Sequence, residues 1–167
     1  MATAPNPVSF DEYMHTSYSP DCEYIDGAIL ERNVGKGKHA YTQGKVYLWI
    51  SQKVGPKSLI VLPEQRVRIS ATRVRIPDVC VVERLEEVIS TPPLLCVEIL
   101  SPDDRWGHVN ASISDYQNMG VQCIWVIDPY RSRAWVFELE NPPTEATDGR
   151  IRSEALGIEL NLADLLP

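Results

Sequence analysis

Two short apolar runs, rich in β-branched residues, lie in the middle of the chain, and each contains a single carboxylate. The first run covers residues 76–82 and contains Asp78, and the second covers residues 94–100 and contains Glu98. Runs of this length and composition predict strands buried within a sheet. A buried carboxylate is costly unless a cation or hydrogen-bond donors compensate its charge. We therefore expect these two strands to organise the fold and their acids to have a common partner.

That partner could be a metal ion. Side chains two residues apart in a strand share a face, so the two acids can converge if the strands are neighbours. Two carboxylates, a backbone carbonyl and water molecules suit Mg²⁺, which takes oxygen ligands and usually keeps several waters. The competing interpretation is that both acids lie at strand ends and pair with nearby arginines, because ion pairs are common in proteins. The spacing of Asp78 and Glu98 alone leaves both interpretations open.

Length and composition fit one soluble domain. The chain has 167 residues, 44% of them hydrophobic, and we expect a single domain with its own core over residues 1–167. No apolar run approaches the roughly 20 residues of a membrane helix. The first residues also lack a basic segment followed by an apolar one. We therefore expect a cytoplasmic protein without membrane association.

The cysteines and the net charge argue against two kinds of protein, one with a zinc site and one that coats nucleic acid nonspecifically. The four cysteines form no close pair and no zinc-binding spacing, and three lie inside apolar runs, so we expect reduced thiols in the core. The formal net charge of −7 argues against a protein that coats nucleic acid nonspecifically, because such binding depends on phosphate neutralisation. A local basic groove remains compatible with this charge.

Local signals predict the elements that precede the central strands. Ser9 and Glu12 have the spacing of a capping box, which predicts a short helix from Phe10 to about His15. The turn dipeptide Asp26-Gly27 predicts a hairpin between residues 23–25 and 28–32. After it we expect a flexible basic loop over 35–39, a helix over 40–54 that Gly55-Pro56 ends, and strands over 59–62 and 64–69.

Further elements follow the second central strand. Ser101-Pro102 followed by two acids predicts a helix start, and a helical face of Val109, Ile113 and Tyr116 ends at Gly120. Strands are expected over residues 121–127 and 134–139, and residues 151–160 could add a last one. We expect residues 162–167 to pack loosely.

The two acids also carry a resemblance to a known group of enzymes. Pro77-Asp78, followed twenty residues later by Glu98 in an apolar strand and then by a helix, resembles the PD-(D/E)XK nuclease superfamily. More segments are similar, in the same order, to the Uma2 family of putative restriction endonuclease domains: Glu23 to Gly27, Arg75 to Val79, Val97 to Pro102, Tyr116, Gly120-Val121 and Trp125 to Pro129. The resemblance covers nearly the whole chain.

The resemblance implies both a fold and a chemistry. The fold would be a restriction-endonuclease-like core of the α/β class (α+β, with a mixed sheet), in which helices flank a central mixed sheet and a hairpin lies at the N-terminus. This agrees with the predicted elements. The activity would be hydrolysis of phosphodiester bonds in nucleic acid, DNA first, with Mg²⁺ or Mn²⁺ bound by Asp78 and Glu98. Glu64 would be a further metal ligand and Glu23 an additional acid. Cutting both strands of a duplex would need a homodimer.

One position departs from the resemblance. The superfamily motif has a lysine two residues after the glutamate, where this chain has Leu100. In the Uma2 family, which this chain resembles, that lysine lies on the following helix, at the position where this chain has Ser112. The lysine orients the attacking water and offsets phosphate charge, and neither leucine nor serine supplies a cation. We expect its loss to lower the rate rather than to abolish metal binding.

Other cations could replace that lysine. Arg105 and His108 share a helix face with Ser112 if the helix is continuous, and we expect them to be catalytic. Arg105 could instead form a surface salt bridge with a neighbouring aspartate. His39, in the basic loop, could simply be the residue at which a helix begins. Alternatives to Arg105 and His108 lie in that basic loop: Lys36, Lys38 and His39.

A group of arginines alternates along two predicted strands: Arg66, Arg68, Arg73 and Arg75. They could form a basic stripe that contacts phosphates, or an ordinary solvated sheet face, which is the preferred interpretation. Asp78 has the opposite parity to Arg75, so the stripe is expected on the far face from the metal ligands.

The missing lysine also motivates a second hypothesis about function. The chain would then be a nuclease-fold module that has lost catalysis and serves in binding or oligomerisation. Restoring a lysine at Ser112 separates this hypothesis from that of an active nuclease.

Overall fold

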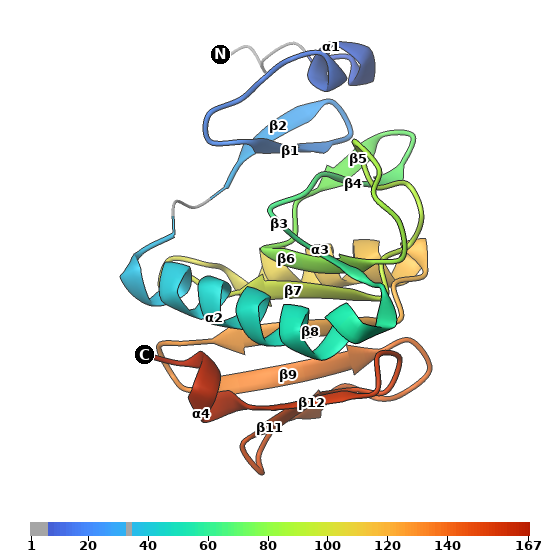
Figure 1. Cartoon of the computed structure of the whole chain (residues 1–167). Coiled ribbons are helices and arrows are strands. Elements are labelled where there is room, and N and C mark those ends of the chain that lie inside the picture. Colours follow the sequence, from blue (N-terminus) through green and yellow to red (C-terminus); the bar gives the residue numbers. More distant parts are fainter. Residues whose placement is uncertain (1–6, 33–34) are drawn as a thin grey trace.

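A mixed sheet lies at the centre of the computed structural model, which describes residues 7–32 and 35–167 (Figure 1). Its strands, from one edge to the other, are β10 (Thr144–Glu145), β9 (Arg133–Glu138), β8 (Cys123–Asp128), β7 (Leu95–Ile99), β6 (Val79–Val82) and β3 (Ile60–Pro63). β7 and β8 are parallel, and the other neighbouring pairs are antiparallel. The expected fold class, a central mixed sheet flanked by helices, is confirmed.

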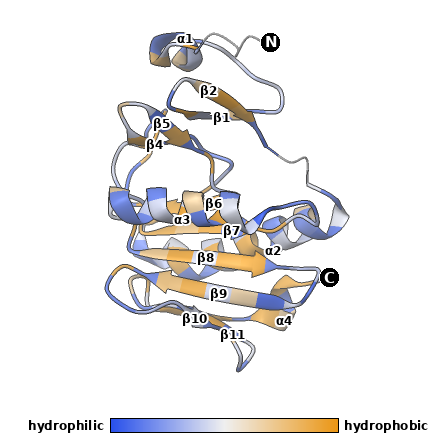
Figure 2. Ribbon diagram, turned by 180° about the vertical axis from the view of Figure 1, so that it is seen from behind, coloured by the Kyte–Doolittle hydropathy of each residue, from blue (hydrophilic) through white to orange (hydrophobic). Residues whose placement is uncertain are grey.

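Two helices cover opposite faces of this sheet (Figures 1 and 2). α2 (Gly37–Val54) buries an apolar ridge on one face: Val46, Ile50 and Val54. α3 (Trp106–Met119), which connects β7 to the parallel strand β8, buries a second ridge on the other face: Val109, Ile113 and Tyr116. Successive strand residues point to opposite faces, so β6 and β7 supply apolar side chains to both cores. The predicted helical face of Val109, Ile113 and Tyr116 is thereby confirmed.

A second sheet lies toward the N-terminal end, at the top of Figure 1. It consists of β2 (Ala28–Glu31), β1 (Cys22–Ile25), β5 (Arg73–Arg75) and β4 (Val67–Ser70), in that order. β1 and β2 form the predicted hairpin, in which Asp26 and Gly27 have φ of 50° and 93° and make the turn. α1 (Phe10–Met14) begins as expected, because the Ser9 hydroxyl accepts a hydrogen bond from the Glu12 N–H.

The chain ends against the main core. β11 (Arg150–Ser153) and β12 (Ile158–Asn161) form a separate pair, where a single strand over 151–160 was expected. The left-handed Gly157, with φ 60°, lies in the turn between them. α4 (Leu162–Leu165) contradicts the expected loose packing, because Leu165 is fully buried in the core on the α2 face.

Two helix starts differ from the prediction. α2 begins at Gly37, so the predicted loop is helical from there, and His39 in its first turn contacts Asp78, the residue before β6. α3 begins only after Arg105, whose backbone is extended. The Asp104 carboxylate instead accepts a hydrogen bond from the Ser101 N–H at 2.6 Å and closes a turn before the helix. Within the described residues, no helix is both long and apolar enough to cross a membrane.

Candidate functional site

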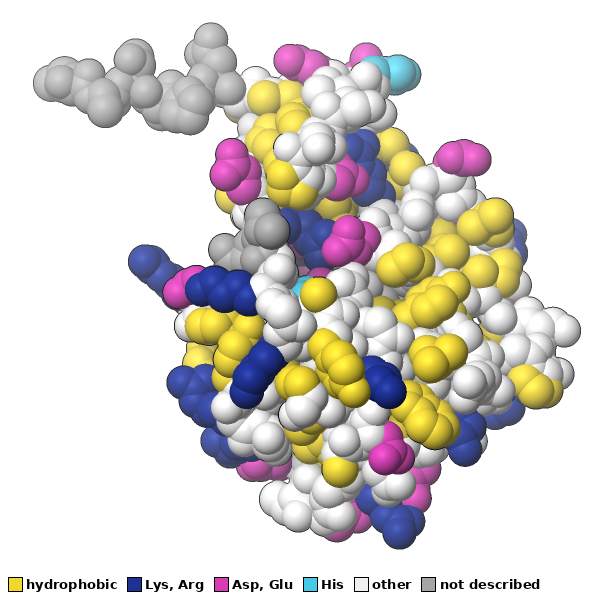
Figure 3. Space-filling model, turned by 60° about the vertical axis from the view of Figure 1, so that its left-hand side comes forward, with side chains coloured by type: hydrophobic (Ala, Val, Ile, Leu, Met, Phe, Trp, Pro, Cys, Tyr) yellow, Lys and Arg dark blue, Asp and Glu magenta, His cyan; other side chains and the backbone are white. Residues whose placement is uncertain are grey.

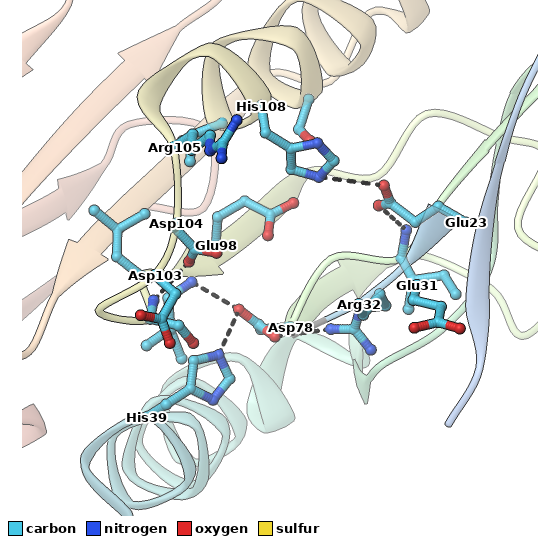
Figure 4. Close-up of a pocket in the computed structure, with 16 residues that line it drawn as sticks. Glu23, Glu31, Arg32, His39, Asp78, Glu98, Asp103, Asp104, Arg105 and His108 are labelled. Atoms are coloured by element: carbon cyan, nitrogen blue, oxygen red, sulfur yellow. Dashed lines mark hydrogen bonds and ion pairs between the residues drawn. The ribbon is translucent and has the colours of Figure 1, made fainter. Parts of the chain in front are cut away.

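The two acids of the central strands face each other at the end of the β6–β7 pair. Val79 lies opposite Val97, so the next position in this antiparallel register places Asp78 opposite Glu98. Both side chains line a pocket of about 290 Å³ between α2, α3 and the N-terminal hairpin (Figure 4). The sequence left two interpretations open: that the two acids converge on a metal ion, or that they pair with arginines. The acids do lie opposite each other, and Asp78 also pairs with an arginine, Arg32.

Asp78 is held by donors on both of its oxygens. Its Oδ2 accepts a hydrogen bond from the Ile99 N–H at 2.7 Å and lies 3.2 Å from Nε2 of His39. Its Oδ1 accepts a hydrogen bond from Nη2 of Arg32 at 2.9 Å. The side chain is only 6% exposed, so these contacts compensate a carboxylate that solvent barely reaches.

Glu98 is held by Tyr116 of α3, whose hydroxyl donates a hydrogen bond of 2.6 Å to Oε1. The Glu98 carboxylate opens partly onto the pocket, yet protein atoms surround it closely. Burial raises the pKa of Glu98 well above its ordinary value, and the negative charges of Asp78 and Glu23 raise it further. A negative charge at Glu98 is therefore costly unless a cation lies beside it.

Glu23 brings a third acid to the pocket from β1. Its Oε1 accepts a hydrogen bond from the Ile76 N–H at 3.1 Å, and its Oε2 lies 2.7 Å from Nη1 of Arg75. Arg75 also donates to Asp115 of α3 at 2.7 Å. This buried network joins the second sheet to α3 and leaves Glu23 at the pocket wall.

The network corrects the expected basic stripe. Arg75 is 2% exposed and engaged by two carboxylates, while Arg66 and Arg73 pair with Asp21 and Asp26. Arg68 packs over the Phe10 ring. The parity argument was wrong because β5 ends at Arg75 and β6 begins at Val79 in a different sheet. Each of these arginines therefore contacts an acid or an aromatic ring, and Arg68 remains exposed to solvent.

Arg105 and His108 both line the pocket (Figure 4). Leu100 and Ser112, the two positions where a lysine was expected, also belong to its lining. Arg105 is the exposed N-cap residue of α3, and His108 lies one turn further, with Nε2 3.7 Å from Oε2 of Glu23. Leu100 and Ser112 are 7% and 4% exposed. The expected substitutes for the lysine thus surround the same space as the two acids.

The other predicted residues lie at different depths. His39 is 7% exposed, and burial lowers its pKa, but the hydrogen bond and charge of Asp78 outweigh burial and leave the pKa raised. Glu64 lies outside the pocket lining, is half exposed, and approaches Arg32 at 3.9 Å. Lys36 pairs with Asp103 at 3.1 Å, and Lys38 lies over the Tyr130 ring.

Arg32 was missed by the sequence analysis. It follows β2, and in Figure 4 its guanidinium reaches into the pocket toward Asp78. A charged residue at the end of a hairpin normally reads as solvent-exposed, and no motif marks a contact across 46 residues of sequence. The one signal that could have pointed to Arg32 is that two acids in buried strands need a cation nearby.

The charges around the pocket favour a cation. Six carboxylates line it, against two arginines and two histidines. Figure 3 shows side chains of both charges and a histidine (cyan) close together below the N-terminal part of the molecule. Among the residues that the structure describes, no three His, Cys, Asp or Glu side chains form a group that could hold a metal ion. Asp78 and Glu98 nevertheless fit a hard divalent cation whose remaining ligands are backbone oxygen or water.

Known proteins share this fold. The model of the Uma2 family, described as "Putative restriction endonuclease", matches residues 10–163. A crystal structure of a putative nuclease belonging to DUF820 from Anabaena variabilis is similar over 95% of this chain and 97% of that one, with a TM-score of 0.85 and 23% sequence identity. A search of the curated proteins found no match.

Proposed function

The chain belongs to the Uma2 family of putative restriction endonucleases, and we propose that it is a metal-dependent nuclease that hydrolyses phosphodiester bonds of nucleic acid. The observation that supports this most is the placement of Asp78 and Glu98 opposite each other at the edge of one acidic pocket. Hydrogen bonds from Ile99 and Tyr116 already orient both carboxylates, which favours the binding of a cation between them.

Asp78 and Glu98 would hold the metal, with Mg²⁺ or Mn²⁺ as the ion that suits two carboxylates. When bound, such an ion supplies a water of lowered pKa and offsets negative charge on the phosphate. The protein orients both ligands, since Ile99 and His39 position Asp78 while Tyr116 positions Glu98. Glu64 would not bind the metal ion directly in this arrangement. Its carboxylate lies 3.9 Å from Arg32, outside the two ligands.

Arg105 and His108 would do the work of the missing lysine. Both project from the start of α3 toward the pocket, above Glu98 in Figure 4. Arg105 is exposed enough to meet a phosphate that enters from solvent, and a guanidinium can bind two phosphate oxygens at once. His108 faces Glu23 and can exchange a proton with a water beside it.

The finer assignments are part of the same proposal. We propose DNA as the substrate, a homodimer as the form that cuts both strands, and the cytoplasm as the location. The dimer follows from symmetry, because two strands of opposite polarity need two equivalent sites.

Cleavage assays test the proposal. Supercoiled plasmid, linear duplex, single-stranded DNA and RNA are incubated with the full chain and Mg²⁺ or Mn²⁺, with and without EDTA. We expect cleavage that EDTA abolishes and that Asp78→Asn and Glu98→Gln each lower by about a hundredfold or more. Absence of metal-dependent cleavage on all substrates, or full activity in both variants, contradicts the proposal.

Loss of catalysis is the second candidate function, supported by apolar Leu100 and buried Ser112 at the two lysine positions. The protein would then be a binding or oligomerisation module with a nuclease fold. Nucleic-acid binding without cleavage in the same assays would favour it.

A further inference from the structure

We infer that Arg32 is a built-in competitor of the divalent cation, occupying Oδ1 of Asp78 and releasing it when the metal binds. The inference rests on the metal site proposed above and adds a residue that no motif assigns. It follows from which oxygen of Asp78 each neighbour occupies.

The two oxygens of Asp78 have different partners. Oδ2 faces the Ile99 N–H at 2.7 Å and the His39 ring at 3.2 Å, both fixed to the framework of β7 and α2. Oδ1 has a contact with Arg32 at 2.9 Å. Each carboxylate oxygen has two lone pairs. Two donors face Oδ2, whereas the contact with Arg32 uses one lone pair of Oδ1, so Oδ1 is the oxygen on which a metal ion would coordinate, next to the guanidinium.

Arg32 is held there by charge. Its side chain is 19% exposed, and its second nitrogen approaches Glu64 at 3.9 Å. The carboxylates of Glu98 and Glu23 also line the pocket and attract the guanidinium. A guanidinium and a divalent cation on one partly buried carboxylate oxygen repel strongly, because the low effective dielectric screens them little. Each of the two cations therefore weakens the binding of the other at Oδ1.

The exchange also frees a guanidinium inside the pocket. Arg32 stays attached next to the end of β2, within reach of the space between Asp78 and α3. Guanidinium groups bind phosphate oxygens in a two-pronged geometry. The released side chain can thus supply the positive charge on substrate that Leu100 and Ser112 lack.

Calorimetric titration of the full chain with MnCl₂ and MgCl₂ tests the competition. We expect Arg32→Gln to bind metal about tenfold more tightly than the wild type, because the competing charge is gone. Arg32→Lys keeps the positive charge on a shorter side chain, so its metal affinity should lie between those of the wild type and Arg32→Gln. Arg84→Gln removes an arginine that is 70% exposed and pairs with Glu86 outside the pocket, and should leave the affinity unchanged.

Two further measurements separate the outcomes. Asp78→Asn should abolish the tight titration, which identifies the measured ion as the one at this site. In EDTA, Arg32→Gln should melt at a lower temperature than the wild type, since Asp78 loses the partner of its Oδ1, and saturating metal should reduce that difference. Unchanged or weaker metal binding by Arg32→Gln overturns the competition.

Cleavage by Arg32→Gln tests the phosphate contact. We expect slower cleavage at saturating metal despite the tighter binding, a combination that a purely structural arginine would not produce. Tighter binding with equal or faster cleavage overturns the phosphate role of Arg32 and leaves the competition standing. If the wild type cleaves nothing, the calorimetry still decides the competition, so failure of the proposed function is distinguishable from failure of this inference.

Discussion

The backbone N–H of Ile99 donates a hydrogen bond of 2.7 Å to Oδ2 of Asp78. Ile99 directly follows Glu98, so the strand that presents one acid also fixes the other. The antiparallel register of β6 and β7 therefore sets the spacing of the two carboxylates before any ligand arrives. Such preorganisation is what a metal site on rigid strands requires.

Tyr116→Phe removes the hydroxyl that donates to Glu98 at 2.6 Å. We expect a loss of about 1–2 kcal/mol in the free energy of unfolding, because a buried carboxylate loses a donor, together with weaker Mn²⁺ binding. Urea unfolding and calorimetry measure the two effects. Tyr13→Phe is the matched control, since the buried Tyr13 hydroxyl donates to the Cys22 carbonyl at 2.8 Å, away from the pocket. Equal effects of both variants on metal affinity contradict the assigned role of Tyr116.

Arg75→Met leaves Glu23 and Asp115 as buried carboxylates without their shared cation. Breaking a buried ion pair by removing one partner costs about 3–5 kcal/mol, so we expect a loss of that size in urea unfolding. Arg150→Met removes an arginine that is 53% exposed and pairs with Glu159, and should cost less than about 1 kcal/mol. Similar costs for the two variants would show that the network around Arg75 is not a structural support.

Ser112→Lys adds a cation to the wall of the pocket, at the position where the resemblance to the family led us to expect a lysine. We expect faster metal-dependent cleavage, by about tenfold or more, because the ammonium can offset phosphate charge. Ser114→Lys on the exposed side of the same helix controls for added charge and for helix stability. Cleavage rates of the two variants under identical conditions give the comparison. No difference between them would mean that position 112 does not contribute to catalysis.

The four cysteines are predicted to be unreactive in the folded protein. All four are free and buried, and burial raises the pKa of Cys80 and Cys123 to about 12. Burial also raises the pKa of Cys96 and Cys22. Because the thiolate is the reactive form, Ellman's reagent at pH 8 should react slowly with native protein and rapidly with all four thiols in guanidinium chloride. Rapid reaction of a native thiol would contradict this packing.

Local signals predicted the elements that local physics controls. The dipeptide Asp26-Gly27 makes the hairpin turn, and Ser9 caps α1. Gly120 ends α3 in the left-handed conformation, with φ 97°. The apolar composition of the two central runs predicted buried strands but left open whether these strands are neighbours. The structure pairs them and places Asp78 opposite Glu98.

Long-range contacts lay beyond such signals. The glycines around residue 37 favoured a loop, yet α2 starts there and His39 packs against Asp78. Arg32 carries no spacing signal, because only the folded hairpin brings it to the pocket. Leu165 looked like part of a loose tail, but the core on the α2 face encloses it. Each of these contacts depends on tertiary packing that one sequence window does not contain.

Anomalous diffraction from crystals soaked in MnCl₂ tests the central claim most directly. The account predicts one strong peak between Asp78 and Glu98, at a coordination distance of about 2.1–2.2 Å from Oδ1 of Asp78, with Arg32 moved off that oxygen. Crystals of Asp78→Asn, soaked in the same way, should lack the peak. Density for Mn²⁺ elsewhere on the protein, with Asp78 and Glu98 free of metal at saturating concentration, would contradict the account.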